Sequence, residues 1–222
     1  MSFGNNALAY LTSLNPRFKV PRGIGILPQF SSPEAIHVNE VFYQTFFNDE
    51  NPRDLILGIN PGRFGAGITG IAFTDPIRLE TVLKIKNTFQ KKPELSSVFI
   101  YELIQKFGGP EKFYAKFFVN SVCPLGFTKE GKNLNYYDLP ELEKLVTPFI
   151  IDSLEKVVQL GVNTKKVFCL GEGKNYKFLD KLNQRHQFFK QIIPLAHPRY
   201  IMQYKRKQVE HYMKQYGINL GF

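Results

Sequence analysis

Four short apolar runs, separated by stretches long enough for helices, constrain the fold of this chain more than any other feature. The runs cover residues 54–59, 117–122, 166–171 and 191–196. Short, continuously apolar strands are typical of parallel sheets whose two faces are both covered by helices. We therefore predict an α/β fold, a three-layer α/β/α sandwich with a central, mainly parallel four-stranded sheet. In such folds ligands bind beyond the carboxyl ends of the strands.

The intervals between these runs carry helix signals. Ser32 can cap a helix that has Pro33 and Glu34 in its first turn. No low-complexity linker interrupts the 222 residues, which predicts a single domain, 1–222, with residues 1–50 as a helical extension packed on it. Pro148 is expected to kink or split the helix that contains it. Helices are predicted over residues 32–46, 76–90, 97–107, 138–160 and 171–182, and again after residue 196.

The composition limits the partners and the compartment. The chain has 29 Lys and Arg against 19 Asp and Glu, a formal charge of +10. Such a charge favours binding to a polyanion such as DNA, and the other explanation is that it only keeps the protein in solution. The two cysteines, Cys123 and Cys169, lie in predicted strands, which excludes a disulfide framework. The N-terminal residues lack the features of a signal peptide, and no window is long and apolar enough for a membrane span. We expect a cytoplasmic monomer without membrane contact.

The loop GINPGRFGAGITGIAF, residues 58–73, contains the letters of a dinucleotide-binding fingerprint at Gly65, Gly67 and Gly70. That fingerprint requires its first glycine at the end of the strand, whereas six residues follow Gly58 before the motif begins here. No G-K-[ST] for a nucleotide phosphate loop is present either. The alternative is that the glycines let the backbone approach a flat ligand closely.

One distinctive polar residue stands at the end of three of the predicted strands: Asn60, Asn120 and His197. Each has an ordinary structural explanation, because Asn60 and His197 precede prolines in turns and Asn120 can close a strand. The carboxyl ends of parallel strands meet at one edge of the sheet, so the three together favour a functional site there.

The loop and two later segments resemble a known family. G-x-N-P-G-x-F-G in residues 58–65 is similar to the first motif of the single-strand-selective monofunctional uracil-DNA glycosylases, of the uracil-DNA glycosylase superfamily. NSVCPLGF, residues 120–127, resembles that family's strand-end asparagine and Cys-Pro-Leu, and AHPR, residues 196–199, resembles its second motif. The resemblance implies an enzyme that flips uracil out of DNA and hydrolyses its glycosidic bond, leaving an abasic site.

The resemblance also implies roles for individual residues. Asn60 would position the attacking water, and His197 would donate a hydrogen bond to uracil O2 as charge develops there. Asn120 would select uracil through its O4 and N3–H, and Phe73 would stack on the ring, although core packing is the other explanation for a phenylalanine. The implied catalytic residues are Asn60 and His197, and the implied substrate-binding residues are Ile59, Gly62, Phe64, Phe73 and Asn120.

The second motif departs from the family pattern. His197-Pro198 is followed directly by Arg199 and Tyr200, without the usual Ser-Pro. Interleaved basic and aromatic residues can plug the gap in the duplex and hold phosphates, or they can form the solvated face of a helix. The predicted DNA-binding residues are Arg63, Arg199, Tyr200, Lys205 and Arg206.

Gly62 stands where the first motif would face the C5 atom of uracil. A glycine leaves room there for a water or a small polar substituent, which predicts release of 5-hydroxymethyluracil besides uracil. No metal or organic cofactor is implied. Two alternatives remain open: a catalytically silent nucleic-acid-binding protein on the same fold, and an N-glycosidase of free nucleosides or nucleotides.

Overall fold

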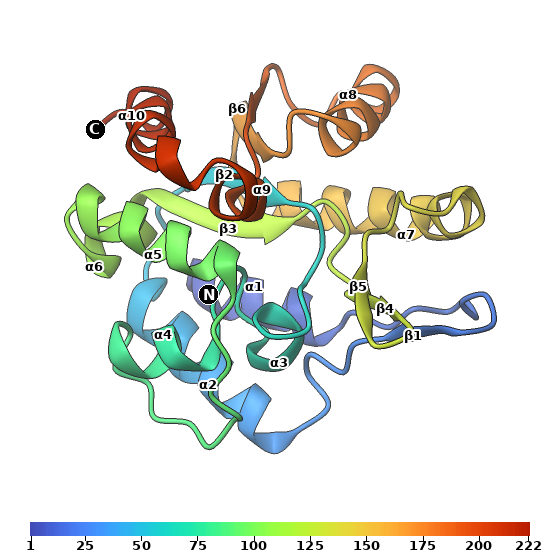
Figure 1. The fold of residues 1–222 in the computed structure, drawn as a ribbon, viewed down its shortest axis with the longest axis horizontal. Coiled ribbons are helices and arrows are strands. Elements are labelled where there is room, and N and C mark those ends of the chain that lie inside the picture. The colour runs from blue at the N-terminus through green and yellow to red at the C-terminus, as the bar shows by residue number, and fades with distance from the viewer.

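The computed structural model describes residues 1–222 and is built on a four-stranded sheet (Figure 1). Its strands are β2 (Asp54–Gly58), β3 (Phe117–Ser121), β6 (Asn163–Leu170) and β7 (Ile192–Leu195), in the order β3-β2-β6-β7. Every neighbouring pair is parallel. The predicted α/β fold with a parallel four-stranded sheet is therefore confirmed.

The apolar strands are buried on both faces. Leu55, Ile56 and Leu57 of β2 are at most 3% exposed, and every residue of β3 is buried. Alternate side chains of a strand point to opposite faces, so helices must cover both. In Figure 1, α8 and α10 lie on one side of the sheet, and α1 and α2 lie on the other. The helices are α1 (Phe3–Thr12), α2 (Pro33–Phe46), α3 (Ala66–Thr69), α4 (Pro76–Thr81), α5 (Leu95–Phe107), α6 (Pro110–Lys116), α7 (Pro140–Gln159), α8 (Lys174–His186), α9 (Pro198–Tyr204) and α10 (Val209–Leu220).

Local signals set most helix boundaries. The Ser32 hydroxyl accepts a hydrogen bond from the Ala35 amide at 3.0 Å, which confirms the cap of α2. The helix predicted over 76–90 is wrong beyond Thr81, because the chain turns out of helical geometry and Lys84 has a φ of +61°. Helix α7 runs through Pro148 without a break. The predicted C-terminal helix is two helices, α9 and α10, joined by a 3₁₀ turn.

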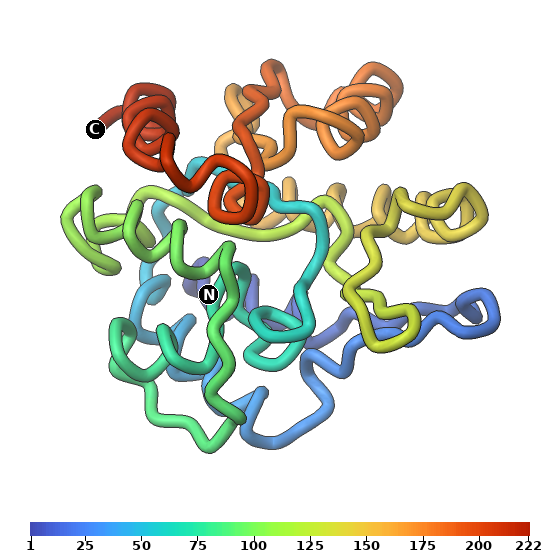
Figure 2. The backbone as a smooth tube through the Cα atoms, in the orientation of Figure 1, coloured from blue at the N-terminus to red at the C-terminus, as the bar shows by residue number.

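The N-terminal region contributes more than helices. Strand β1 (Ile24–Ile26) pairs with β4 (Phe127–Lys129), which pairs with β5 (Lys132–Leu134), in a small antiparallel sheet that the sequence did not predict. Figure 2 shows the blue N-terminal segment beside this hairpin. Helix α1 is held against α7 by a 2.6 Å hydrogen bond between Tyr10 and Ser153. None of the helices combines the length and apolarity that crossing a membrane requires.

Candidate active site

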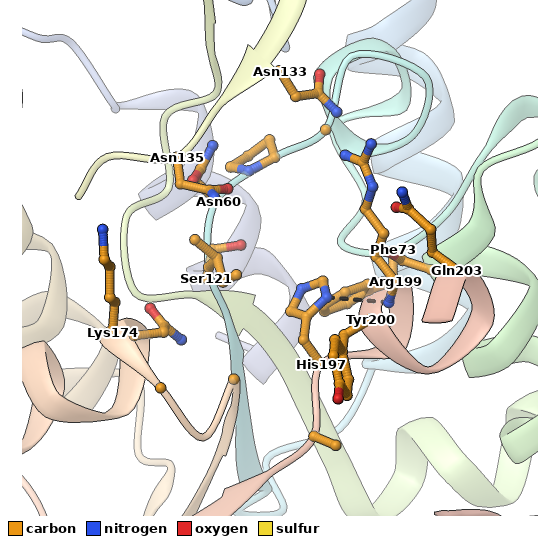
Figure 3. Close-up of a pocket in the computed structure, with 18 of the residues that line it drawn as sticks. Asn60, Phe73, Ser121, Asn133, Asn135, Lys174, His197, Arg199, Tyr200 and Gln203 are labelled. Atoms are coloured by element: carbon orange, nitrogen blue, oxygen red, sulfur yellow. Dashed lines mark hydrogen bonds between the residues drawn. The ribbon is translucent and has the colours of Figure 1, made fainter. Parts of the chain in front are cut away.

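A cavity of about 580 Å³ opens at the carboxyl ends of the strands (Figure 3). Loops that leave β2 and β7 bring Asn60 and His197 to it, although these two strands are separated in the sheet by β6. Seven of the residues predicted from the sequence line this cavity: Ile59, Asn60, Gly62, Phe73, His197, Arg199 and Tyr200.

The side-chain amide of Asn60 is held in one orientation. Its Nδ2 donates to the Leu134 carbonyl at 3.2 Å, and its Oδ1 accepts from the Tyr136 amide at 3.3 Å. Tyr136 is in turn fixed by its hydroxyl, which donates to the buried Asn175 at 2.9 Å. Strand β5 and the segment that follows it thus determine the orientation of the Asn60 amide in the cavity. A carbonyl-type oxygen has two lone pairs, so Oδ1 can still accept a hydrogen bond from a water.

His197 caps α9 and is oriented by the backbone of that helix. Its Nδ1 accepts a hydrogen bond from the Arg199 amide at 3.1 Å, the dashed line in Figure 3. In the neutral ring the proton is then on Nε2, which is free to donate. Burial, with a smaller contribution from the Arg199 charge, lowers the pKa of His197 to about 4. The imidazole is therefore neutral at physiological pH.

Phe73 forms an aromatic wall of the cavity. Its ring lies 5.9 Å from the His197 ring, and its backbone has a φ of +53°, which is unfavourable for a residue with a side chain. A Cβ added to Gly58 would come within 2.7 Å of this ring. Gly58 at the end of β2 is therefore required for the ring to lie across the strand end.

Asn120 does not line the cavity, and its contacts give no support to its predicted role in reading the base. Its Nδ2 donates to the Tyr10 hydroxyl of α1 at 3.4 Å, and its Oδ1 accepts from the Ser121 amide at 2.8 Å. Phe118, two residues earlier, packs on Phe3 of α1, so this face of β3 belongs to the core. The next residue, Ser121, points the other way and lines the cavity.

Glu94, which sequence reasoning missed, lines the cavity from the residue before α5. Its carboxyl lies directly against Gly62 and Gly65, in the space that side chains at those positions would fill. The room that we expected beside Gly62 is therefore taken, and the prediction of a 5-hydroxymethyluracil site based on it is not supported by the geometry. Burial, followed by repulsion from Asp75, raises the pKa of Glu94 to about 7, against an opposing effect of Arg199.

The predicted DNA contacts divide into two groups. Arg199 and Tyr200 line the mouth of the cavity, where Tyr200 and Tyr204 are 44% and 67% exposed and their rings lie 5.8 Å apart. Lys205 and Arg206 follow directly after α9 and do not line the cavity.

Arg63 and Phe64 also lie outside the cavity. The guanidinium of Arg63 lies 4.4 Å from the Phe64 ring and Lys92 approaches the same ring, so Phe64 packs against cations outside the cavity lining.

Most other cavity residues carried no recognisable sequence signal, because they come from segments far apart in the chain. Figure 3 shows Asn135 near Asn60, Lys174 across from His197, and Gln203 on α9 with Arg199, and Asn133 lies beside Gly62. Only GEGKN, residues 171–175, could have been found, as a polar loop at the end of a strand. The structure holds no cluster of three or more His, Cys, Asp or Glu side chains suited to a metal ion.

Comparison with known proteins agrees with this geometry. A family model described as the uracil DNA glycosylase superfamily matches residues 44–219. The crystal structure of wild-type SMUG2 from Pedobacter heparinus is similar to this chain with 47% identity and a TM-score of 0.94, over 97% of this chain and 95% of that one. With a match over most of its length and a site built at the expected strand ends, the chain belongs to the uracil DNA glycosylase superfamily.

Proposed function

We propose that this protein is a monofunctional uracil-DNA glycosylase, which hydrolyses the bond between uracil and deoxyribose and leaves an abasic site. One observation carries the proposal: Asn60 and Phe73, from the segment after β2, and His197, from the loop after β7, converge on a single cavity in a chain of this superfamily. Membership supports a glycosylase acting on DNA in general, and the cavity residues support the choice of reaction.

The proposed reaction needs little activation of the nucleophile. As the bond breaks, the sugar approaches an oxocarbenium ion, which a positioned water can attack without a strong base. Asn60, fixed by two backbone hydrogen bonds, would hold that water through the free lone pair of Oδ1. An amide cannot serve as a strong base, and this mechanism does not require one.

The departing base takes up negative charge, which His197 would stabilise. A neutral imidazole with its proton on Nε2 can donate to a carbonyl oxygen of the base. The low pKa of His197 keeps it in this form, and Phe73 beside it offers a face on which the flipped base can stack.

The proposed cleavage stops at hydrolysis. A second step at the sugar would require an amine that forms a Schiff base with it. The lysine of the cavity lining is Lys174, which is exposed at the edge of the cavity. Its ammonium lies 5.9 Å from the Tyr137 ring. We therefore propose water as the nucleophile.

We propose that DNA lies across the face that carries Arg199, Tyr200 and Tyr204. Exposed aromatic rings beside a cavity can fill the gap left by a flipped nucleotide, and the +10 charge favours the phosphate backbone. Two free buried cysteines are consistent with the reducing cytoplasm.

The deciding experiment compares matched single- and double-stranded oligonucleotides that carry uracil, 5-hydroxymethyluracil or thymine, together with free deoxyuridine. Alkaline cleavage after incubation detects abasic sites, and chromatography detects the free base. Release of uracil from DNA but not from deoxyuridine supports the proposal. Binding without release would indicate a silent DNA-binding protein, and cleavage of deoxyuridine would indicate a nucleoside glycosidase.

A further inference from the structure

Glu94 is a carboxyl group inside the cavity that the proposed mechanism does not use. Its backbone amide donates to the Asp75 carboxylate at 2.9 Å, which fixes the residue at the start of α5. The side chain does not cap its own helix and receives no hydrogen bond from the protein. It lies against Gly62 and Gly65, the two glycines that make space for it. A polar side chain that faces a cavity and has no partner in the protein is available to a ligand.

The charges around Glu94 come from three elements. Asp75 at the start of α4 is fully buried and is bridged by Arg78 at 3.1 Å, so its negative charge is partly balanced. Arg199 of α9 approaches from the mouth of the cavity. In the loop with the two glycines, Arg63 is turned onto Phe64. His197 is neutral. Burial outweighs the Arg199 charge and raises the pKa of Glu94 to about 7.

We propose that Glu94, in its protonated form, donates a hydrogen bond to a carbonyl oxygen of the base held in this cavity, and that its ionised form opposes base release. The inference rests on the proposed function, since it concerns the same cavity. A neutral carboxyl offers a donor and an acceptor, as an amide does, whereas a carboxylate only accepts. Ser121 lines the same cavity at the end of β3. Its single hydroxyl can serve as either donor or acceptor, so it does not discriminate between a donor and an acceptor on the base.

The reaction itself gives an independent reason for the neutral form. Negative charge develops on the base as the bond breaks, and a carboxylate in the same buried space repels it. Base release should therefore fall by about tenfold per pH unit once Glu94 ionises. Neither His197, with a pKa of about 4, nor the cavity residue Tyr137, with a pKa of about 12, titrates near neutrality.

The test measures single-turnover release of uracil from a single-stranded oligonucleotide, with enzyme in excess, from pH 5.5 to 9. The wild-type rate should decline above a midpoint near pH 7. Glu94→Gln keeps the donor and the shape but cannot ionise, so its rate should stay flat across this range. Glu94→Ala should also be flat, and roughly tenfold slower than Glu94→Gln, because the donor is lost. Thermal unfolding of each variant checks that the fold is intact.

Glu172→Gln is the matched control, since Glu172 is an exposed carboxyl on the same cavity lining, and it should leave the midpoint unchanged. The inference is overturned if the wild-type rate does not change with pH. It is also overturned if the alkaline decline persists in Glu94→Gln, or if its midpoint moves only in Glu172→Gln. In each of these cases the proposed function still stands. A protein that releases no uracil at any pH refutes the proposed function and this inference with it.

Discussion

The carboxyl ends of β2 and β3 lie side by side in one sheet, and an asparagine stands near each of them. Asn60 follows β2 and Asn120 lies near the end of β3, yet the two side chains have different surroundings. Asn60 lies in the loop two residues past β2 and reaches the cavity, where backbone groups of β5 and of the segment after it hold it. Asn120 is still within β3, is 5% exposed and bonds to Tyr10 on the far side. The cavity position at the end of β3 belongs to Ser121.

This difference shows which side-chain positions can be predicted from a sequence motif. A loop that leaves a parallel strand is directed to the ligand edge of the sheet whatever its exact length. A residue inside a strand faces one side or the other, and a shift of one position reverses the side. The motif NSVCPLGF therefore pointed to a strand end at the cavity, but Ser121 lines the cavity there and the predicted Asn120 does not.

The largest expected effect is at the two catalytic positions. Asn60→Ala and His197→Ala should each slow uracil release by roughly 10²- to 10³-fold, because the water or the hydrogen bond to the departing base is lost. Single-turnover rates measure this, and gel shifts should show DNA binding close to that of the wild type. Wild-type turnover in either variant would remove that residue from the mechanism.

The next effect concerns the aromatic wall. Phe73→Ala should reduce the stabilisation of the transition state by about 1 to 3 kcal/mol, the free energy of one base–aromatic stacking contact. The change should appear in kcat/KM for uracil in DNA, with Phe73→Tyr as the conservative control. Unaltered kinetics in Phe73→Ala would show that Phe73 packs on His197 without contacting the base.

Asn120→Ala tests the comparison directly. Losing its hydrogen bond with Tyr10 should lower the free energy of unfolding by about 1 to 3 kcal/mol, measured in urea, while base release stays close to wild type. Ser121→Ala should do the reverse, with altered base release and little change in stability. If Asn120→Ala slowed release as strongly as Asn60→Ala, Asn120 would act on the base despite facing α1.

The smallest expected effect is on the salt dependence of DNA binding. It compares basic residues at the carboxyl ends of the strands with basic residues at their amino ends. Lys205→Ala combined with Arg206→Ala, beside the cavity, should reduce the slope of log affinity against log salt by up to about 2. Lys112→Ala combined with Lys165→Ala is the control, because these lysines lie near the amino ends of β2 and β6. Equal slopes for the two pairs would place the DNA elsewhere.

The sequence by itself determined the parallel sheet, the helix cap at Ser32, the glycine-rich loop and the convergence of Asn60 and His197. These follow from local propensity and from the rule that parallel strands end at one edge. Only the tertiary structure decided which residue of β3 faces the cavity, because that depends on a one-residue register. It also decided that Glu94 fills the space beside Gly62. The two residues are about thirty positions apart in the sequence, so their contact depends on tertiary packing and cannot be predicted from a local sequence pattern.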